Sequence, residues 1–249
     1  MGHRALGFLA AIAALSGVLG QDSPTFGTTV VVPGGLRGSI YFIPQNTAVL
    51  PDFGRDDLER AGEIWTDSLN ILPRHWTSGF PGLTERFEWF ALDYSGRFWI
   101  EKPGRYTFAL LSDDGSRLYL DDVPAIDNDC QHPPDLRIAA VKLEGGVHTI
   151  RVSYFQGPRD CISLLLAIAG PDGMWRVFNT RDFTPPSNPE TWNYPGASSV
   201  TIVPTTPEEA SLSIDRLIRR LTGSGRSEKH SSKSKTRGCL YDPVRFCGK

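Results

Sequence analysis

Residues 104–127, with the sequence GRYTFALLSDDGSRLYLDDVPAID, contain two strand-like runs joined by a turn. Apolar side chains alternate along residues 106–110 and 117–121, which is the period of a half-buried β-strand. The turn between the runs carries two adjacent carboxylates, Asp113 and Asp114. Neighbouring negative charges are unfavourable at a hairpin tip unless they cap the turn through hydrogen bonds or hold a cation. The function of the chain depends on which of these roles the pair has.

The same alternation of short runs and turns continues over residues 28–173. Seven or more strand-length runs follow one another without a long helical period, which predicts an all-β protein built as an antiparallel β-sandwich. Residues 55–64 are the exception and are expected to form one or two helical turns. The runs expected as strands are 30–32, 39–43, 85–100, 104–112, 116–122, 136–145, 147–157, 161–170 and 175–178.

Large aromatic residues are frequent in these runs. They could form an exposed platform on which a sugar stacks, or they could fill the core between two sheets. Core packing is expected for most of them, because inward faces of alternating strands need large side chains. Trp76 lies beside Arg74 and His75 near a loop and is a candidate for exposure. The set comprises Trp65, Trp76, Trp89, Trp99, Phe87, Phe90 and Phe98.

The first twenty residues indicate the compartment. His3 and Arg4 precede an apolar run that ends in small residues, which is typical of a secretory signal peptide and predicts cleavage before Gln21. The run is too short to be a transmembrane helix. The sequence therefore predicts a secreted protein, extracellular or periplasmic.

The remainder divides by composition. Residues 21–180 form the expected sandwich domain, and the proline-rich residues 181–205 are expected to be a linker. Residues 206–222 predict an amphipathic helix that begins with a capping box at Thr206. Residues 223–249 are basic and serine-rich, and we expect this tail to be disordered.

Charge is distributed unevenly along the chain. Residues 21–200 contain 15 Lys and Arg against 23 Asp and Glu, a net charge of −8, whereas residues 201–249 contain 10 against 5, a net charge of +5. The acidic body argues against nucleic acid as a partner, because phosphate contacts need clustered Lys and Arg, and it favours a cation. The basic tail is either a solvated tether or a segment that associates with an anionic cell envelope.

Four cysteines in a secreted chain predict two disulfides. Their spacing is not Cys-x-x-Cys, so a zinc site is a weaker interpretation. Cys239 and Cys247 are close together in the tail and are natural partners in a small ring, which leaves Cys130 with Cys161. Closing that loop would add about 3–4 kcal/mol to the free energy of unfolding in the chain-entropy account.

Motifs of catalysis are absent from the sequence. There is no G-x-S-x-G elbow, H-E-x-x-H pair, P-loop or dinucleotide-binding glycine motif. Glycoside hydrolysis needs two carboxyl groups several ångströms apart, and directly adjacent residues such as Asp113 and Asp114 are poorly placed for it. His148 lies in a strand of alternating character and is expected to be structural. We therefore expect a protein that is not an enzyme. A glycosidase is a weaker interpretation than a binding role or a structural role.

Several short motifs follow one another in an order typical of one domain family. They are GRYTF (104–108), SDDGSRLYLD (112–121), AIDN (125–128), LEGGVHTIRVSYF (143–155) and AGPDG (169–173). Over residues 35–173 the chain resembles the fourteen-kilodalton domain of the anthrax protective antigen, which also occurs in yeast flocculins, epithelial adhesins and bacterial β-glucosidases. The resemblance implies a lectin-like β-sandwich of the jelly-roll type.

The resemblance also implies a metal site. In the lectin members of the family, a calcium ion binds sugar hydroxyls and is held by an Asp–Asp pair joined by a cis peptide. Asp113 and Asp114 stand where that pair stands. A second loop, here residues 156–161, supplies further ligands, and yeast members use an Asn there. Gln156 and Asp160 are the residues that would replace it as calcium ligands. The residues expected to contact the sugar are Asp113, Asp114, Gln156, Gly157 and Arg159.

The leading interpretation is a secreted, calcium-assisted carbohydrate-binding module. The alternative is a structural or adhesion module of the cell envelope, without metal, in which the Asp pair only caps a turn.

Overall fold

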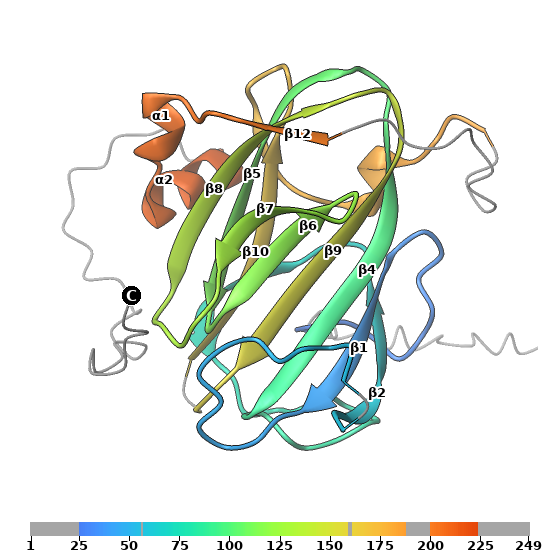
Figure 1. Cartoon of the computed structure of the whole chain (residues 1–249), viewed down its shortest axis with the longest axis vertical. Helices are drawn as coiled ribbons and strands as arrows, with labels where there is room; N and C mark the ends of the chain where they lie inside the picture. Colours follow the sequence, from blue (N-terminus) through green and yellow to red (C-terminus); the bar gives the residue numbers. More distant parts are fainter. Residues whose placement is uncertain (1–24, 56, 159–160, 188–199, 224–249) are drawn as a thin grey trace, which may run out of the picture.

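The computed structural model describes residues 25–55, 57–158, 161–187 and 200–223, which form two antiparallel β-sheets packed face to face (Figure 1). The predicted all-β sandwich is confirmed. Residues 1–24 and 224–249 lie outside the described part, and with them the expected signal peptide, the basic tail and the Cys239–Cys247 ring. No helix among the described residues is long and apolar enough to cross a membrane.

Each sheet has six strands. The first sheet has the order β2 (Glu59–Thr66), β1 (Leu36–Phe42), β4 (Phe90–Ile100), β9 (Gly146–Gln156), β6 (Ser116–Leu120) and β7 (Val123–Asn128). The second has the order β11 (Trp175–Val177), β10 (Cys161–Ala169), β5 (Gly104–Asp113), β8 (Asp135–Leu143) and β12 (Val200–Val203), and β3 (Asn70–His75) also pairs with β10. The two runs around the Asp pair, β5 and β6, therefore belong to different sheets.

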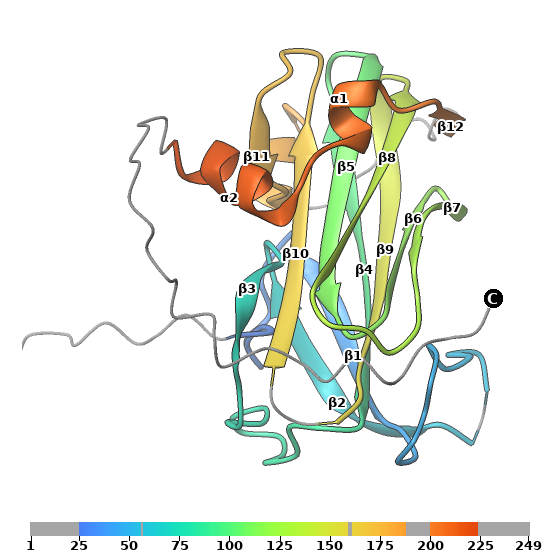
Figure 2. The same cartoon turned by 90° about the vertical axis from the view of Figure 1, so that its left-hand side faces the viewer.

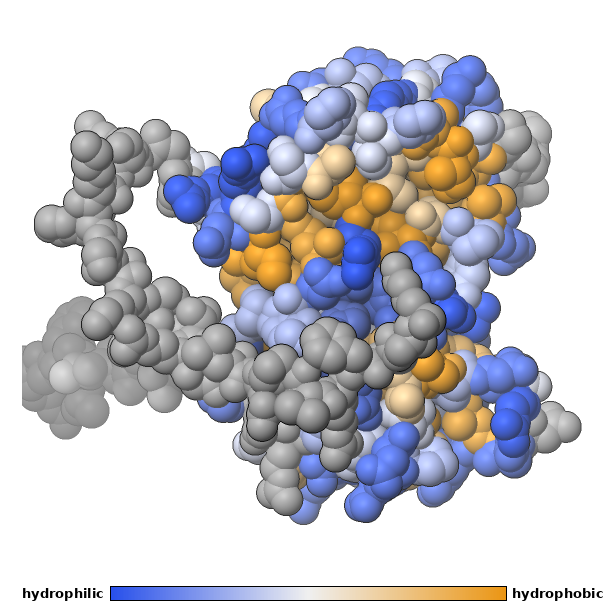
Figure 3. Space-filling model, turned by 60° about the vertical axis from the view of Figure 1, so that its left-hand side comes forward, coloured by the Kyte–Doolittle hydropathy of each residue, from blue (hydrophilic) through white to orange (hydrophobic). Residues whose placement is uncertain are grey.

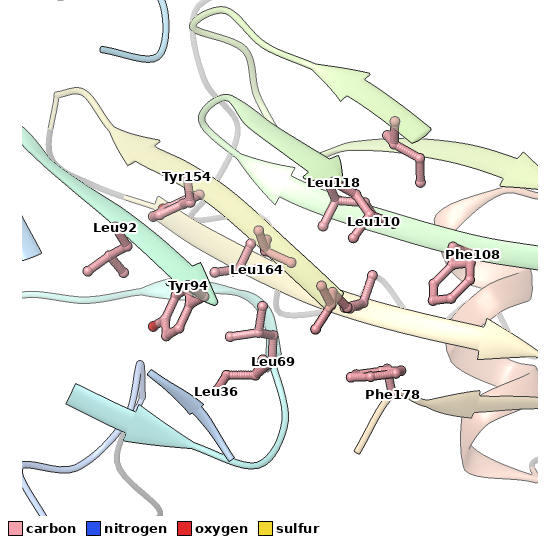
Figure 4. Packing of buried hydrophobic residues seen from close by; sticks show 14 of the residues in the cluster. Leu36, Leu69, Leu92, Tyr94, Phe108, Leu110, Leu118, Tyr154, Leu164 and Phe178 are labelled. Atoms are coloured by element: carbon pink, nitrogen blue, oxygen red, sulfur yellow. The ribbon is translucent and has the colours of Figure 1, made fainter. Parts of the chain in front are cut away.

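The core lies between the two sheets. Its large side chains come from inward-facing positions of both layers, which alternate along each strand. Figure 4 shows this packing for Tyr94, Phe108, Leu110, Tyr154 and Leu164, among others. Fully burying one such side chain contributes about 1.5–3 kcal/mol to stability, so the alternation seen in the sequence is the main determinant of the fold.

A smaller apolar cluster lies on the outer face of the second sheet. Ala109 and Leu111 of β5 alternate with the inward-facing Phe108 and Leu110, and Leu165 and Ala167 of β10 lie beside them. Two helices, α1 (Pro207–Ala210) and α2 (Ile214–Thr222), cover this face (Figure 2). Leu217 of α2 is fully buried against it, whereas part of the apolar surface around the helices remains visible in Figure 3.

The predicted capping box at Thr206 is confirmed. The Thr206 side chain accepts a hydrogen bond from the Glu209 backbone, and the Glu209 carboxylate accepts one from the Thr206 N–H. Glu209 also binds the Arg105 guanidinium of β5, with 2.6 Å between Nη2 and Oε2, and this contact lowers the pKa of Glu209 to about 2. The expected single helix over 206–222 is wrong, because Ser213 caps a second helix that ends at Gly223 in the left-handed conformation.

Three further expectations about secondary structure are wrong. Residues 59–64, expected to be helical, belong to β2, whose pairing with β1 overrides a weak local preference. Residues 30–32 form no strand. The side chains of Val30 and Val31 remain exposed because this segment does not pair with either sheet. Part of the expected linker, β12, pairs with β8 at the edge of the second sheet.

The aromatic residues serve the core, as expected. Trp76, the candidate for exposure, is buried, and its ring packs edge-to-face on Phe26 with 5.0 Å between ring centroids. Trp89 is buried as well, and Trp65 and Trp99 are half-buried. A short 3-10 helix, η1 (Thr180–Phe183), stacks Phe183 on the core residue Phe178.

Candidate functional site

Asp113 and Asp114 lie at the end of the sandwich where β5 finishes. Asp113 is the last residue of β5, and the peptide bond between the two residues is cis, as the resemblance implied. Both residues are almost fully buried, with 5% and 2% of their surfaces exposed. Two carboxyl groups are therefore held side by side at a position with little access to water.

Asp114 connects two loops through its side chain. Its Oδ1 accepts a hydrogen bond from the His132 backbone N–H at 3.1 Å, and its Oδ2 accepts one from the Gly157 N–H at 2.8 Å. Burial raises the pKa of Asp114 to about 6, although these two hydrogen bonds favour the charged form. Gly157, predicted to lie at the site, does so through its main chain.

Asp113 has a different environment. Among the described residues, none donates a hydrogen bond to its carboxylate. Its main-chain carbonyl accepts one from the Tyr154 hydroxyl at 2.6 Å. Burial, and then the nearby charge of Asp114, raise the pKa of Asp113 to about 8. A buried carboxyl group without a donor is suited to binding a cation, because a positive charge is the partner that its charged form lacks.

Ser163 of β10 lies beside Asp113 in the strand register. It is fully buried, and its hydroxyl has no hydrogen-bond partner in the described part of the chain. Ser163 was not a predicted site residue, because only the pairing of β10 with β5 brings its position next to Asp113.

Gln156, the last residue of β9, contacts protein groups through both polar atoms of its side chain, and its predicted role as a calcium ligand stays a prediction. Its Oε1 lies 2.5 Å from the Tyr154 hydroxyl, and its Nε2 donates to the carbonyl oxygens of Pro158 and Cys161, both at 3.1 Å. The side chain therefore holds the loop closed behind the Asp pair. Asp160 and Arg159, the other two predicted residues of this loop, lie outside the described residues.

A third loop, between β1 and β2, also contacts the site, although the sequence did not assign it there. It reaches the site through Gln131, whose N–H and Nε2 donate to the carbonyl oxygens of Ala48 and Thr47 at 3.1 and 2.8 Å. Asp129 Oδ1 accepts from the Leu50 N–H at 2.7 Å. Polar residues clustered around position 129 were visible in the sequence, but their partner eighty residues earlier was not.

A network of buried polar side chains on the strands next to the Asp pair supports the site. Ser116 donates from its hydroxyl to the Ser112 hydroxyl at 2.7 Å, and Asn128 Nδ2 donates to the same oxygen at 2.9 Å and to the Asp135 carbonyl at 3.2 Å. The network joins β5, β6 and β7 directly behind the turn. Satisfied buried polar groups of this kind fix the geometry around them.

The donor set can be compared with the needs of a metal ion. No group of three or more His, Cys, Asp and Glu side chains that could hold a metal occurs in residues 25–55, 57–158, 161–187 and 200–223. From the described residues alone, a cation at the Asp pair would therefore bind two carboxylates and otherwise neutral oxygens. Oxygen ligands with few charges fit Ca²⁺, which tolerates irregular geometry and takes carbonyl oxygens and water. Zinc, which prefers nitrogen and sulfur, does not fit.

The cysteines lie at the same end of the molecule. Neither Cys130 nor Cys161 is a free thiol. Their pairing with each other stays a prediction.

His148 lies far along β9 from the Asp pair. It is fully buried, and its Nδ1 lies 2.6 Å from Asp121 Oδ2 while its Nε2 lies 3.0 Å from the Glu144 carbonyl oxygen. Asp121 also accepts a hydrogen bond from the Thr149 N–H at 2.7 Å. This arrangement closes the β6–β7 hairpin onto β9, which agrees with the structural role expected of the histidine.

A family model described as "PA14 domain" matches residues 40–177. Two solved structures have a TM-score of 0.50: the PA14 domain of the MpAFP antifreeze protein, 18% identical over 65% of this chain and 94% of that chain, and the PA14 sugar-binding domain from an RTX adhesin, 17% identical over 60% and 97%. At these identities the likeness shows the fold alone.

An anti-sigma factor domain-containing protein is also similar, with 22% identity and a TM-score of 0.48 over 62% of this chain. This chain spans about half of that protein, 49% of its length. No curated protein sequence matches the chain.

Proposed function

Because the chain belongs to the PA14 domain family, we propose that it is a secreted carbohydrate-binding module in which Asp113 and Asp114 hold a calcium ion. The observation that carries this proposal is the pair of adjacent, buried carboxyl groups, one of which has no hydrogen-bond donor among the described residues. Two acidic groups kept out of water are unfavourable unless a positive charge accompanies them. The name of the RTX adhesin domain, which describes it as sugar-binding, supports the choice of ligand.

In this proposal each part of the site has one task. Bound calcium would supply open coordination positions for neighbouring hydroxyl groups of a sugar ring. Asp113 and Asp114 provide the charge that retains the ion. Gly157 and His132 orient Asp114 through their N–H groups, and Gln156 keeps the second loop closed. Asp160 and Arg159 of that loop remain proposed ligands of the ion and of the sugar, respectively.

A second candidate function is a module of the cell envelope without metal. It is favoured by one observation, the use of both Asp114 oxygens to hold the loops at His132 and Gly157. This role does not use the Asp113 carboxylate, which is why we rank it second. The two candidates differ in whether binding depends on calcium.

A glycan array separates the two candidates. We expect the purified protein to bind a set of glycans in calcium-containing buffer and to lose at least tenfold of that signal in the presence of a chelator. The glycan-binding signal of an Asp113→Asn variant should be as low in calcium-containing buffer as in chelator. Asp127→Asn, which removes an exposed carboxylate, should bind glycans as the unmutated protein does. Glycan binding that survives the chelator would favour the candidate without metal.

The pH dependence of stability provides a separate prediction. Folding raises the pKa values of Asp113 and Asp114 from 3.8 to about 8 and about 6. Between about pH 4 and pH 8 the folded protein thus retains protons that the unfolded chain has lost, so without a cation the free energy of unfolding decreases as the pH rises through this range. We expect Asp113→Asn to flatten this decrease, measured by thermal unfolding in chelator from pH 5 to 9. Equal slopes for both proteins would contradict the raised pKa of Asp113.

A further inference from the structure

Ser163 carries a buried hydroxyl that the fold itself does not use. The residue is fully buried near the start of β10, and its Oγ has no hydrogen-bond partner among the described residues. An unpaired hydroxyl in the interior is unfavourable, because it has lost its bonds to water without replacement. Such a hydroxyl would be stabilised by a hydrogen-bond partner that becomes available when the site binds a cation.

The strand register identifies that partner. Ser163 of β10 is directly opposite Asp113 of β5 in the antiparallel pair, so both side chains point to the same face of the sheet. Directly opposite residues have Cβ atoms about 4.5–5.5 Å apart, within reach of a hydrogen bond between a serine and a carboxylate. The next residues on this face, Leu111 and Leu165, belong to the apolar cluster and offer no polar group.

The two unpaired groups complement each other chemically. A serine hydroxyl can rotate and donate one hydrogen, and an ionised carboxylate only accepts. The Asp113 carboxyl group has no other donor in the described part of the chain. A hydrogen bond to a carboxylate is stronger than one between neutral groups.

We propose that Ser163 is a positioning residue of the cation site, whose hydroxyl donates to the Asp113 carboxylate and fixes its orientation when a cation is bound. This inference rests on the proposed function, because it requires a cation at the Asp pair. It adds a residue of strand β10 to a site otherwise built from a turn and loops.

The test compares Ser163→Ala with a matched control, Ser153→Ala, in two measurements. Ser153 is also a buried serine, but its hydroxyl donates to Asp93 Oδ1 at 2.8 Å. In chelator we expect Ser163→Ala to melt at or above the temperature of the unmutated protein, because the variant removes an unpaired hydroxyl, whereas Ser153→Ala should melt lower. By calcium titration calorimetry we expect Ser163→Ala to bind roughly tenfold more weakly, consistent with one lost hydrogen bond to a charged group, and Ser153→Ala to bind normally.

Each outcome has a defined meaning. Calcium affinity of Ser163→Ala equal to that of the unmutated protein would overturn the role of Ser163 while leaving the proposed function intact. A loss of melting temperature in chelator as large as that of Ser153→Ala would also overturn it, because the hydroxyl would then already have a partner without the cation. No heat of calcium binding by the unmutated protein would overturn the proposed function, and this inference with it.

Discussion

Calcium is expected to raise the melting temperature of the protein by about 5–10 °C, and the double variant Asp113→Asn, Asp114→Asn is expected to abolish this rise. A ligand that binds only the folded state adds about 2.7 kcal/mol to the free energy of unfolding at one hundred times its dissociation constant. For a domain of this size each kcal/mol corresponds to about 2–4 °C. Differential scanning calorimetry with and without calcium measures the shift.

Controls separate a site effect from a general effect of salt. Asp127→Asn removes a carboxylate that is exposed and near the site, and its calcium response should equal that of the unmutated protein. In chelator at pH 8 the double variant should be more stable than the unmutated protein, because it replaces two buried acids by neutral amides. A calcium response retained by the double variant would mean that the ion binds elsewhere.

Gly115→Ala is expected to destabilise the protein by about 1–3 kcal/mol, the usual cost of forcing extra volume into a packed interior. A methyl group at this position would lie 2.4 Å from Phe155 Cε1 and 2.9 Å from both Asp129 Oδ1 and the Cys130 backbone nitrogen. Phe155 is fully buried and cannot move aside easily. The turn that carries the Asp pair would therefore be displaced, and calcium affinity should fall together with stability in denaturant unfolding and calcium titration.

Gly145→Ala is the matched control for this substitution. Gly145 also lies in a loop between two strands, but the nearest atom to an added methyl group, the Ile100 carbonyl oxygen, is 3.6 Å away. We expect less than about 0.5 kcal/mol of change, as for most surface substitutions without a specific mechanism. Similar losses for the two variants would show that the close packing around Gly115 is not what limits its replacement.

The fold could be predicted to a large extent from the sequence. Strand-length apolar runs bounded by turns identified β4, β5, β6, β8, β9 and β10, and in several of them the side chains alternate because the core of a sandwich imposes a period of two on the strands that border it. Residues 59–64 were missed because β2 is an edge strand with only one buried large side chain, Ile64. Its conformation is determined by pairing with β1, which local sequence does not report.

The site was predictable only in part. Asp113 and Asp114 are conspicuous because two carboxylates at a turn are unusual, and Gly157 follows from the loop that faces them. Ser163, the proposed positioning residue, could not be identified from the sequence, because its relation to Asp113 exists only in the register of two strands fifty residues apart. Gln156 stays a predicted ligand, and the sequence did not show that Tyr154 and two loop carbonyls would contact its polar atoms.

The helices on the outer face have a practical consequence for how the protein is divided. The family model ends at residue 177, yet α2 shields Ala109, Leu111, Leu165 and Ala167 from water. A fragment trimmed to the family boundary would display these side chains and leave the edge of β8 without β12, a combination that promotes aggregation. We therefore expect a soluble recombinant fragment to extend at least through residue 223. If a shorter fragment is insoluble, that result would give no information about its ligand.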